Sequence, residues 1–269
     1  MSDRVIEKHI SAEEHIAWLT LNRPEKKNAL NNEMMDMLIA DINEISDMQD
    51  IRVIVLGAKG DSFCSGLDLH DLRADHGAYN RFGRPKSTPE ITRLLRQAPQ
   101  ITLAAVQGYA LGGGLVLVNA CDMAIAADTA RLGMPEILRG SYGMVATPTL
   151  FQSGVPKRIA FGVQLTGRNL TGEESARWGL VNECVPEAQL ADHVDQLARE
   201  LASRHPVALA HAKIAAYAAW DLPFHFAMQA DEQINHRQRY YIDPMGDLDE
   251  YLKSQKGGGN TSFVRPDAE

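Results

Sequence analysis

The chain has 269 residues, of which 45% are hydrophobic and 23% are charged, and its formal net charge is −8. This size and composition fit one globular unit with at most a small appendage. The acidic balance disfavours nucleic acid as the main partner, because polyanions are bound chiefly through basic side chains. No run approaches the ~20 apolar residues needed to cross a bilayer, so we expect no membrane partner.

Three cysteines, Cys64, Cys121 and Cys184, are odd in number and lack the spacing of metal ligands. The nine histidines show no ligand spacing either, so we predict no metal. Free thiols are typical of a reducing compartment. The first residues, MSDRVIEKHI, lack the basic-then-apolar layout of a signal peptide. We therefore expect a cytoplasmic protein.

In the first part of the chain, the spacing of apolar residues alternates between the pattern of a strand and the pattern of a helix. Two strands around a polar turn are expected at 5–10 and 15–22, and a buried strand at 52–57. Between them, apolar positions at helical spacing predict a helix at 33–45, with Asn31 as its cap. This alternation indicates an α/β layered architecture.

The remaining elements continue the pattern and then become helical. Pro135 suits the first turn of a helix, and Thr171 with Glu174 forms a capping box for a helix that ends near Gly179. The other expected elements are strands at 101–106 and 180–185, helices at 68–76, 89–96, from Leu115, at 188–203, 207–220 and 224–239, a mobile loop at 73–87, a soft boundary at 205–206, a flexible connector at 256–260 and a poorly ordered end at 262–269.

The stretch 107–126 contains three consecutive glycines, Gly112, Gly113 and Gly114, between a buried strand and an apolar helix. Glycine lets the backbone take unusual angles and lets another molecule approach it closely. The first N–H groups of the helix are unpaired and carry a partial positive charge, so they can hold an oxyanion. A tight turn is the alternative interpretation. Gly66, beside the small Ser65, offers a second close approach.

Five motifs follow one another between residues 21 and 186: LNRPEKKNAL, FCSGLDL, YALGGGLVLVNACDMAIA, ARLGMPEI and LTGRNLTGEESARWGLVNECVP. In this order and spacing they resemble the crotonase superfamily, the enoyl-CoA hydratase/isomerase family. The resemblance implies an α/β fold, a crotonase-like spiral of ββα units with a C-terminal helical region. It divides the chain into a spiral core with the acyl-CoA site, 1–204, and a helical oligomerisation region, 205–269.

The resemblance also implies an acyl-CoA thioester substrate, no cofactor beyond the coenzyme A of that substrate, and a homotrimer that can pair into a hexamer. The backbone N–H groups of Leu67 and Gly113 map onto the family's oxyanion donors. Such donors can contribute ~3–4 kcal/mol each to an enolate-like transition state. The positions expected to contact coenzyme A or substrate are Lys26, Lys27, Cys64, Ser65, Gly66, Asp68, Gly112, Val116, Ser141 and Tyr142.

Typical hydratases of this family use two glutamates, and only one is present in this chain. Glu136 occupies the second position, whereas Val116 stands at the first and has no proton to give. A carboxylate in a first helical turn can be merely structural, but the motif in register favours Glu136 as the general base. One base suffices to move a proton between carbons of an acyl-CoA, since no water is added.

We therefore predict an isomerase or an atypical hydratase with Glu136 as the single acid/base. A decarboxylase or thioester hydrolase variant and a non-catalytic acyl-CoA binding protein are the alternatives. Ser141 and Tyr142, just beyond Glu136, are placed to donate to a polar acyl group. The segment GSYGMVATPTL, 140–150, departs from the family's glycine-rich pattern, so the acyl chain and pocket shape stay open. Cys64 has no evident histidine partner and is expected to be a small buried thiol.

Overall fold

A computed structural model describes residues 4–74, 88–242 and 252–253 of the chain. Most of the loop expected at 73–87 lies outside the described residues, as do the connector at 256–260 and the end at 262–269. The predicted helix at 68–76 is described up to residue 74, as α2 (Leu69–Ala74). Within the described residues, no helix combines the length and the apolar character that crossing a membrane requires.

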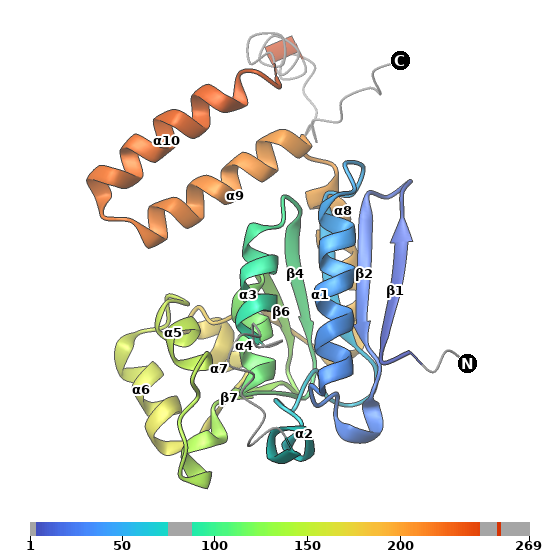
Figure 1. Ribbon diagram of the computed structural model, residues 1–269, viewed down its shortest axis with the longest axis vertical. Helices are drawn as coiled ribbons and strands as arrows, with labels where there is room; N and C mark the ends of the chain where they lie inside the picture. The colour runs from blue at the N-terminus through green and yellow to red at the C-terminus, as the bar shows by residue number, and fades with distance from the viewer. Residues whose placement is uncertain (1–3, 75–87, 243–251, 254–269) are drawn as a thin grey trace.

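A six-stranded sheet forms the centre of the molecule (Figure 1), in the order β1-β2-β3-β4-β6-β9. The first two strands pair antiparallel, and every later pair is parallel. Parallel strands with both faces covered are expected to be apolar throughout, which explains the near-continuous runs in the sequence. The strands are β1 (Ile6–Ser11), β2 (Ile16–Leu21), β3 (Val53–Ala58), β4 (Ile101–Val106), β6 (Met123–Ala127) and β9 (Glu183–Val185).

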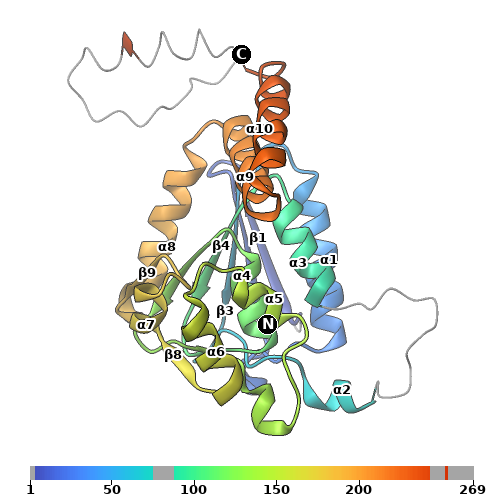
Figure 2. The same ribbon diagram turned by 90° about the vertical axis from the view of Figure 1, so that its left-hand side faces the viewer.

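Helices cover the two faces of this sheet (Figure 2). On one face α8 (Glu187–Ala202) buries an apolar stripe against β3, β4 and β6. The other face carries α1 (Asn32–Ser46), α3 (Thr88–Gln97) and α4 (Gly113–Ala120), which contribute to the main core. The layered α/β architecture predicted from the sequence is confirmed.

A second sheet of three short strands was not predicted. It comprises β5 (Tyr109–Leu111), β7 (Arg131–Gly133) and β8 (Asn169–Thr171), in the order β5-β7-β8. Each strand has three residues, too few for an alternating pattern to be recognised. Its pairing nevertheless sets the position of the glycine loop, as described below.

Helix ends agree with their sequence signals. The Asn31 side chain accepts a hydrogen bond from Met34 N–H at 2.9 Å, so it caps α1 as predicted. The capping box of Thr171 and Glu174 is also present. The helix expected at Pro135 is a 3₁₀ helix. The helices not yet given bounds are η1 (Pro24–Lys26), η2 (Pro135–Arg139), α5 (Ala146–Phe151), α6 (Lys157–Thr166) and α7 (Gly172–Arg177).

The last two helices, α9 (Pro206–Asp221) and α10 (Phe224–Gln238), form a hairpin that projects from the core (Figure 1). A buried lysine of α9 contacts the residue that directly precedes β6, and Tyr217 of the same helix bonds that residue too. Lys213 pairs with Asp122 at 2.8 Å, and their side chains are 3% and 13% exposed. Helix α10 has no buried residue. The helices predicted at 207–220 and 224–239 are confirmed within one residue at each end.

Candidate active site

The two glycine loops singled out in the sequence lie against each other. Leu111 N–H donates to Cys64 O at 2.9 Å, and Cys64 N–H donates to Tyr109 O at 2.8 Å. Gly66 has φ +105, and a Cβ at this position would lie 2.9 Å from Leu111 O. A side chain here would meet both backbone strain and a backbone clash. Glycine is therefore what allows the two loops to meet.

The backbone N–H groups of Leu67 and Gly113 are neighbours in this junction. A Cβ at Gly113 would lie 3.4 Å from Leu67 N, and one at Gly66 would lie 3.6 Å from Gly113 N. Within the described residues, neither N–H has a hydrogen-bond acceptor. Gly113 also begins α4, where N–H groups lack intrahelical partners. The pair has the donor chemistry that an oxyanion requires.

Glu136 places its carboxylate beside these donors. A Cβ at Gly112, whose φ is +51, would lie 2.3 Å from Glu136 Oε1. The other oxygen, Oε2, is buried and has no hydrogen-bond partner among the described residues. Gly143 is a further neighbour of this group, since a Cβ there would lie 3.5 Å from Glu136 Cδ, an ordinary contact distance. Buried acceptors are usually hydrogen-bonded, so this oxygen is a candidate to meet a ligand or a water molecule.

The second sheet explains how Glu136 reaches this place. Strand β5 pairs parallel with β7, so that Leu111 lies opposite Gly133. Gly112 N–H then donates to Gly133 O at 2.9 Å. Glu136 follows Gly133 by three residues, on η2. The register of two short strands therefore brings the glutamate to the glycine turn.

Val116 lies one helical turn beyond Gly112 on α4. Its N–H donates to Gly112 O at 3.0 Å, and the residue is 2% exposed and belongs to the main core. The position that the sequence resemblance matches to the first glutamate of typical hydratases is thus filled by a packed apolar side chain. The site has one carboxylate, that of Glu136, among the residues that meet at this turn.

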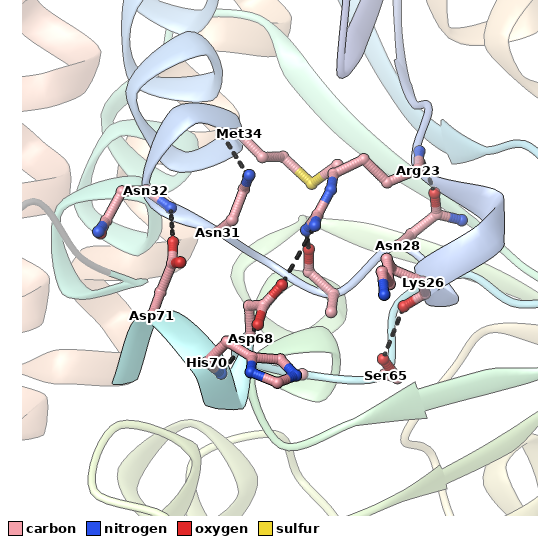
Figure 3. A network of polar contacts seen from close by, with 12 residues as sticks. Arg23, Lys26, Asn28, Asn31, Asn32, Met34, Ser65, Asp68, His70 and Asp71 are labelled. Carbon is pink, nitrogen blue, oxygen red and sulfur yellow. Dashed lines mark hydrogen bonds and ion pairs between the residues drawn. The ribbon is translucent and has the colours of Figure 1, made fainter. Parts of the chain in front are cut away.

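The loop expected to contact coenzyme A lies next to the donor loop (Figure 3). Lys26 and Lys27 are exposed, and Lys27 Nζ stands 4.7 Å from the centre of the Tyr109 ring. Ser65 N–H donates to Lys27 O at 2.9 Å, which holds the two loops together. A pair of exposed ammonium groups at the rim fits a phosphorylated ligand on charge grounds.

Asp68 is engaged within the protein. Its Oδ2 pairs with Arg23 at 3.2 Å, and its Oδ1 accepts from His70 N–H at 3.0 Å. Burial acts to raise the pKa of Asp68, but the His70 N–H and the Arg23 guanidinium outweigh it and hold the pKa below its ordinary value. The carboxylate therefore stays ionised and paired near neutral pH.

Cys64 is fully buried beneath the donor loop, and burial raises the pKa of its thiol to about 12. Its sulfur accepts from Gly66 N–H at 3.4 Å. A thiol so protonated is a poor nucleophile, in agreement with the sequence interpretation.

Ser141 and Tyr142 lie just beyond η2. Ser141 N–H donates to Glu136 O at 3.2 Å, while its hydroxyl reaches Tyr142 O at 3.5 Å. Tyr142 is 63% exposed. Neither hydroxyl hydrogen-bonds the Glu136 carboxylate in the described residues.

A separate cavity of about 750 Å³ lies beneath α9, at the far end of α4. Asn119, Tyr217 and Trp220 are among the residues that line it, and both amide atoms of Asn119 are buried without partners in the described part of the chain. Neither Glu136 nor Gly113 lines this cavity. The described residues contain no cluster of three or more histidine, cysteine or acidic side chains able to hold a metal ion.

Sequence reasoning missed two residues that shape the donor loop, Arg23 and Asn28. Asn28 is fully buried, and its side chain accepts from Arg23 N–H and donates to Lys59 O and Ser62 O, each at 2.8 Å. These partners lie up to 34 residues away. The signal available was a polar residue within the motif LNRPEKKNAL, which does not reveal its partners.

A fold with converging backbone donors and one carboxylate defines a site suited to proton transfer beside an oxyanion. The family model described as Enoyl-CoA hydratase/isomerase matches residues 11–243. The chain therefore belongs to the enoyl-CoA hydratase/isomerase family, the crotonase superfamily, and the resemblance seen in the sequence is confirmed.

Individual relatives agree with this assignment. The chain is 35% identical to (E)-benzylidenesuccinyl-CoA hydratase of Thauera aromatica, over 78% of this chain and 81% of that protein. It is 35% identical to hydroxycinnamoyl-CoA hydratase-lyase of Pseudomonas fluorescens, over 76% and 75% of the two chains. The crystal structure of an enoyl-CoA hydratase from Mycobacterium smegmatis has the same fold, with a TM-score of 0.86, 24% identity and 98% of each chain covered. The crotonase-like fold is thus confirmed.

Proposed function

We propose that the protein catalyses proton transfer on an acyl-CoA thioester, with Glu136 as its single acid/base. The N–H groups of Leu67 and Gly113 hold the thioester oxygen while it carries the negative charge of an enolate. The observation that carries the proposal is the contact of Glu136 Oε1 with Gly112, one residue before the Gly113 donor. Base and donors then act on neighbouring atoms of the substrate.

Double-bond isomerisation fits this arrangement best. Glu136 removes a proton from C2 of a 3-enoyl-CoA, the dienolate oxygen rests on the two N–H groups, and the proton returns to C4. The product is the 2-enoyl-CoA, with no change in composition. Val116 supports this choice, because a 2% exposed valine neither positions water nor exchanges a proton.

Hydration is the second candidate, and the relatives favour it. Both named relatives are hydratases by name, and their names specify unsaturated acyl-CoA substrates. For this chain, hydration requires water to add to C3 while Glu136 alone handles the protons. A polar group of the substrate or another side chain then has to hold the water.

The coenzyme A part of the substrate is proposed to lie along the exposed Lys26 and Lys27, with Cys64, Ser65 and Gly66 forming the wall beside the thioester. The acyl group then extends from Gly112 past Val116. Ser141 and Tyr142 flank its outer end. This placement rests on the positions of these residues around the donor pair.

A paired assay tests the proposal. The protein is incubated with a 2-enoyl-CoA and with the matching 3-enoyl-CoA, and products are identified by mass spectrometry. Conversion of the 3-enoyl substrate at constant mass supports isomerisation, whereas a gain of one water from the 2-enoyl substrate supports hydration. In D₂O, Glu136→Gln abolishes exchange of the substrate's C2 protons if Glu136 is the base; unchanged exchange contradicts its role.

We also propose that the protein assembles as a homotrimer, with the hexamer as its doubled form. Helix α10 supports this, because it contains no buried residue while Phe224 is 81% and Phe226 56% exposed. Large apolar side chains gathered on one helix are typical of a surface that another chain covers.

A further inference from the structure

Arg23 makes two contacts from its guanidinium beside the donor loop (Figure 3). One nitrogen, Nη1, donates to Ala29 O at 2.6 Å, and the other, Nη2, pairs with Asp68 Oδ2 at 3.2 Å. The Arg23 and Asp68 side chains are only 14% and 11% exposed. The planar fork of arginine suits two fixed acceptors, which an ammonium group reaches less well.

These two acceptors belong to the two chain segments that define Leu67. Leu30 N–H donates to Gly66 O at 2.8 Å, and Leu30 O accepts from Asp68 N–H at 2.9 Å. Leu67 therefore sits at the centre of a parallel bridge with Leu30. Because its two neighbours bond to Leu30, the N–H of Leu67 faces the other way, toward Gly113.

Arg23 contacts both segments of that bridge. Ala29 precedes Leu30 on one segment, and Asp68 follows Leu67 on the other. The guanidinium contacts both residues, so it fixes the distance between the two segments. It thereby also fixes the orientation of the peptide that carries the Leu67 N–H.

Arg23 is itself held in place by a buried amide. Asn28 Oδ1 accepts from Arg23 N–H, and Asn28 Nδ2 donates to Lys59 O and Ser62 O. Asn28 has φ +52, a conformation that asparagine tolerates better than most residues. The chain thus uses an unfavourable backbone angle where it anchors the arginine.

We propose that Arg23 is a positioning residue that aims the Leu67 N–H at the thioester oxygen, acting through Asp68 and Ala29. The inference rests on the proposed function, since it assumes that Leu67 is an oxyanion donor. Asp68 then also serves to position Leu67, through its ion pair with Arg23, instead of contacting coenzyme A directly. Donor strength depends on geometry, and a misplacement of about 1 Å in a catalytic group can lower a rate roughly 100-fold.

The test uses the ultraviolet absorption of bound cinnamoyl-CoA, whose conjugated thioester absorbs at longer wavelength when donors polarise its carbonyl. Wild type is expected to show this red shift in spectra recorded on mixing, before any turnover. Arg23→Lys keeps the charge but not the fork. It is expected to lose most of the red shift and to lower kcat on a turned-over enoyl-CoA roughly 10- to 100-fold, with KM within about twofold.

Arg199→Lys is the matched control. Arg199 also bridges two carboxylates, those of Asp195 and Glu14, but it does so from α8 on the opposite face of the sheet. It should leave the red shift, kcat and KM unchanged. If Arg23→Lys does not fold, Asp68→Asn takes its place, because the asparagine oxygen can still accept from His70 N–H while the ion pair is lost. The same loss of red shift is expected.

Three results would overturn the inference. An unchanged red shift in a folded Arg23→Lys or Asp68→Asn variant shows that the donor is aimed without them. A raised KM with intact red shift and kcat assigns Arg23 to coenzyme A binding instead. A wild-type protein that binds cinnamoyl-CoA without any red shift contradicts the donor pair itself, and with it the proposed function.

Discussion

Gly112 is the residue whose backbone conformation leaves room for the carboxylate of the proposed base, Glu136. Its φ is +51, and a Cβ there would lie 2.3 Å from Glu136 Oε1. We predict that Gly112→Ala displaces the carboxylate and lowers the rate of C2 proton exchange roughly 100-fold, the scale expected for a misplaced catalytic group. The measurement is deuterium uptake into an acyl-CoA by mass spectrometry.

Gly140→Ala is the control that separates backbone strain from displacement of the Glu136 carboxylate. Gly140 has φ +72, and nothing lies within 4 Å of the Cβ that alanine would add. Both variants put alanine at a positive φ, but the two backbones differ. Gly140 lies in the left-handed region (ψ 22), where alanine costs about 1–2 kcal/mol, whereas Gly112 has ψ −109, which only glycine adopts readily. Only the Cβ added at Gly112 meets the Glu136 carboxylate. Equal losses of exchange rate in the two folded variants would show that the Gly112–Glu136 contact is not what matters.

Val116 offers the reverse experiment, which adds a group. We predict that Val116→Glu, by restoring a second carboxylate one turn beyond Gly112, raises hydration of a 2-enoyl-CoA at least tenfold, since general acid–base groups typically contribute 10²–10⁴-fold and burial reduces the gain. Product mass measures the effect. Val116→Gln has the same size without the acid, so a similar rise in that variant would contradict a carboxylate mechanism.

Individual site residues differ in how far the sequence predicts them. Glu136 and the glycines stand in motifs whose order along the chain identifies the family, and the family resemblance assigns their roles. Arg23 and Asn28 act through backbone carbonyls and a carboxylate contributed by other segments. No sequence pattern specifies which carbonyl a buried amide contacts, so their role emerged only from the structure.

Elements follow the same division between local and non-local signals. Helices such as α1 and α9 were predicted within a residue or two at their ends, because capping residues and apolar periodicity can be recognised within a short stretch of sequence. The sheet β5-β7-β8 was not predicted, since three-residue strands carry no periodicity. Strand β9 is also shorter than the predicted 180–185, because only Glu183–Val185 pair with β6.

Lys213 joins α9 to α3 and to the residues that directly precede β4 and β6. Its ammonium group donates to Leu95 O at 2.8 Å and Gln100 O at 2.9 Å and pairs with Asp122. Burial lowers the pKa of Lys213, and Asp122 opposes this by favouring the charged form. We predict that Lys213→Met lowers the free energy of unfolding by about 3 kcal/mol, because the mostly buried Asp122 loses its counter-ion and keeps only its hydrogen bonds from Tyr217 and Thr102. Urea denaturation measures this change.

Two further variants test that reasoning. Lys59→Met removes an exposed ion pair with Glu7, whose side chains are 47% and 36% exposed, and should cost less than about 1 kcal/mol. Adding Asp122→Asn to Lys213→Met should restore part of the lost stability, because the unpaired charge is then gone. A double variant less stable than Lys213→Met by the full cost of the Asp122 change alone would indicate no coupling between the two groups.

For the whole molecule, the projecting hairpin is the feature that a single chain does not explain. Phe224 and Phe226 are 81% and 56% exposed on a helix without a buried residue. A fully buried phenylalanine contributes about 1.5–3 kcal/mol relative to an exposed one. A second chain covering α10 would supply that burial, and the proposed trimer provides such a chain.

We predict that replacing both Phe224 and Phe226 by serine dissociates the assembly. At about 1.5–3 kcal/mol for each side chain, the association constant should fall at least roughly 100-fold. Sedimentation equilibrium of the wild type should give a multiple of three chain masses and that of the variant one chain mass. Glu232→Ala on the same helix changes no apolar group and should keep the assembly. A monomeric wild type, or an intact assembly in the double variant, would place the interface elsewhere and leave α10 uncovered.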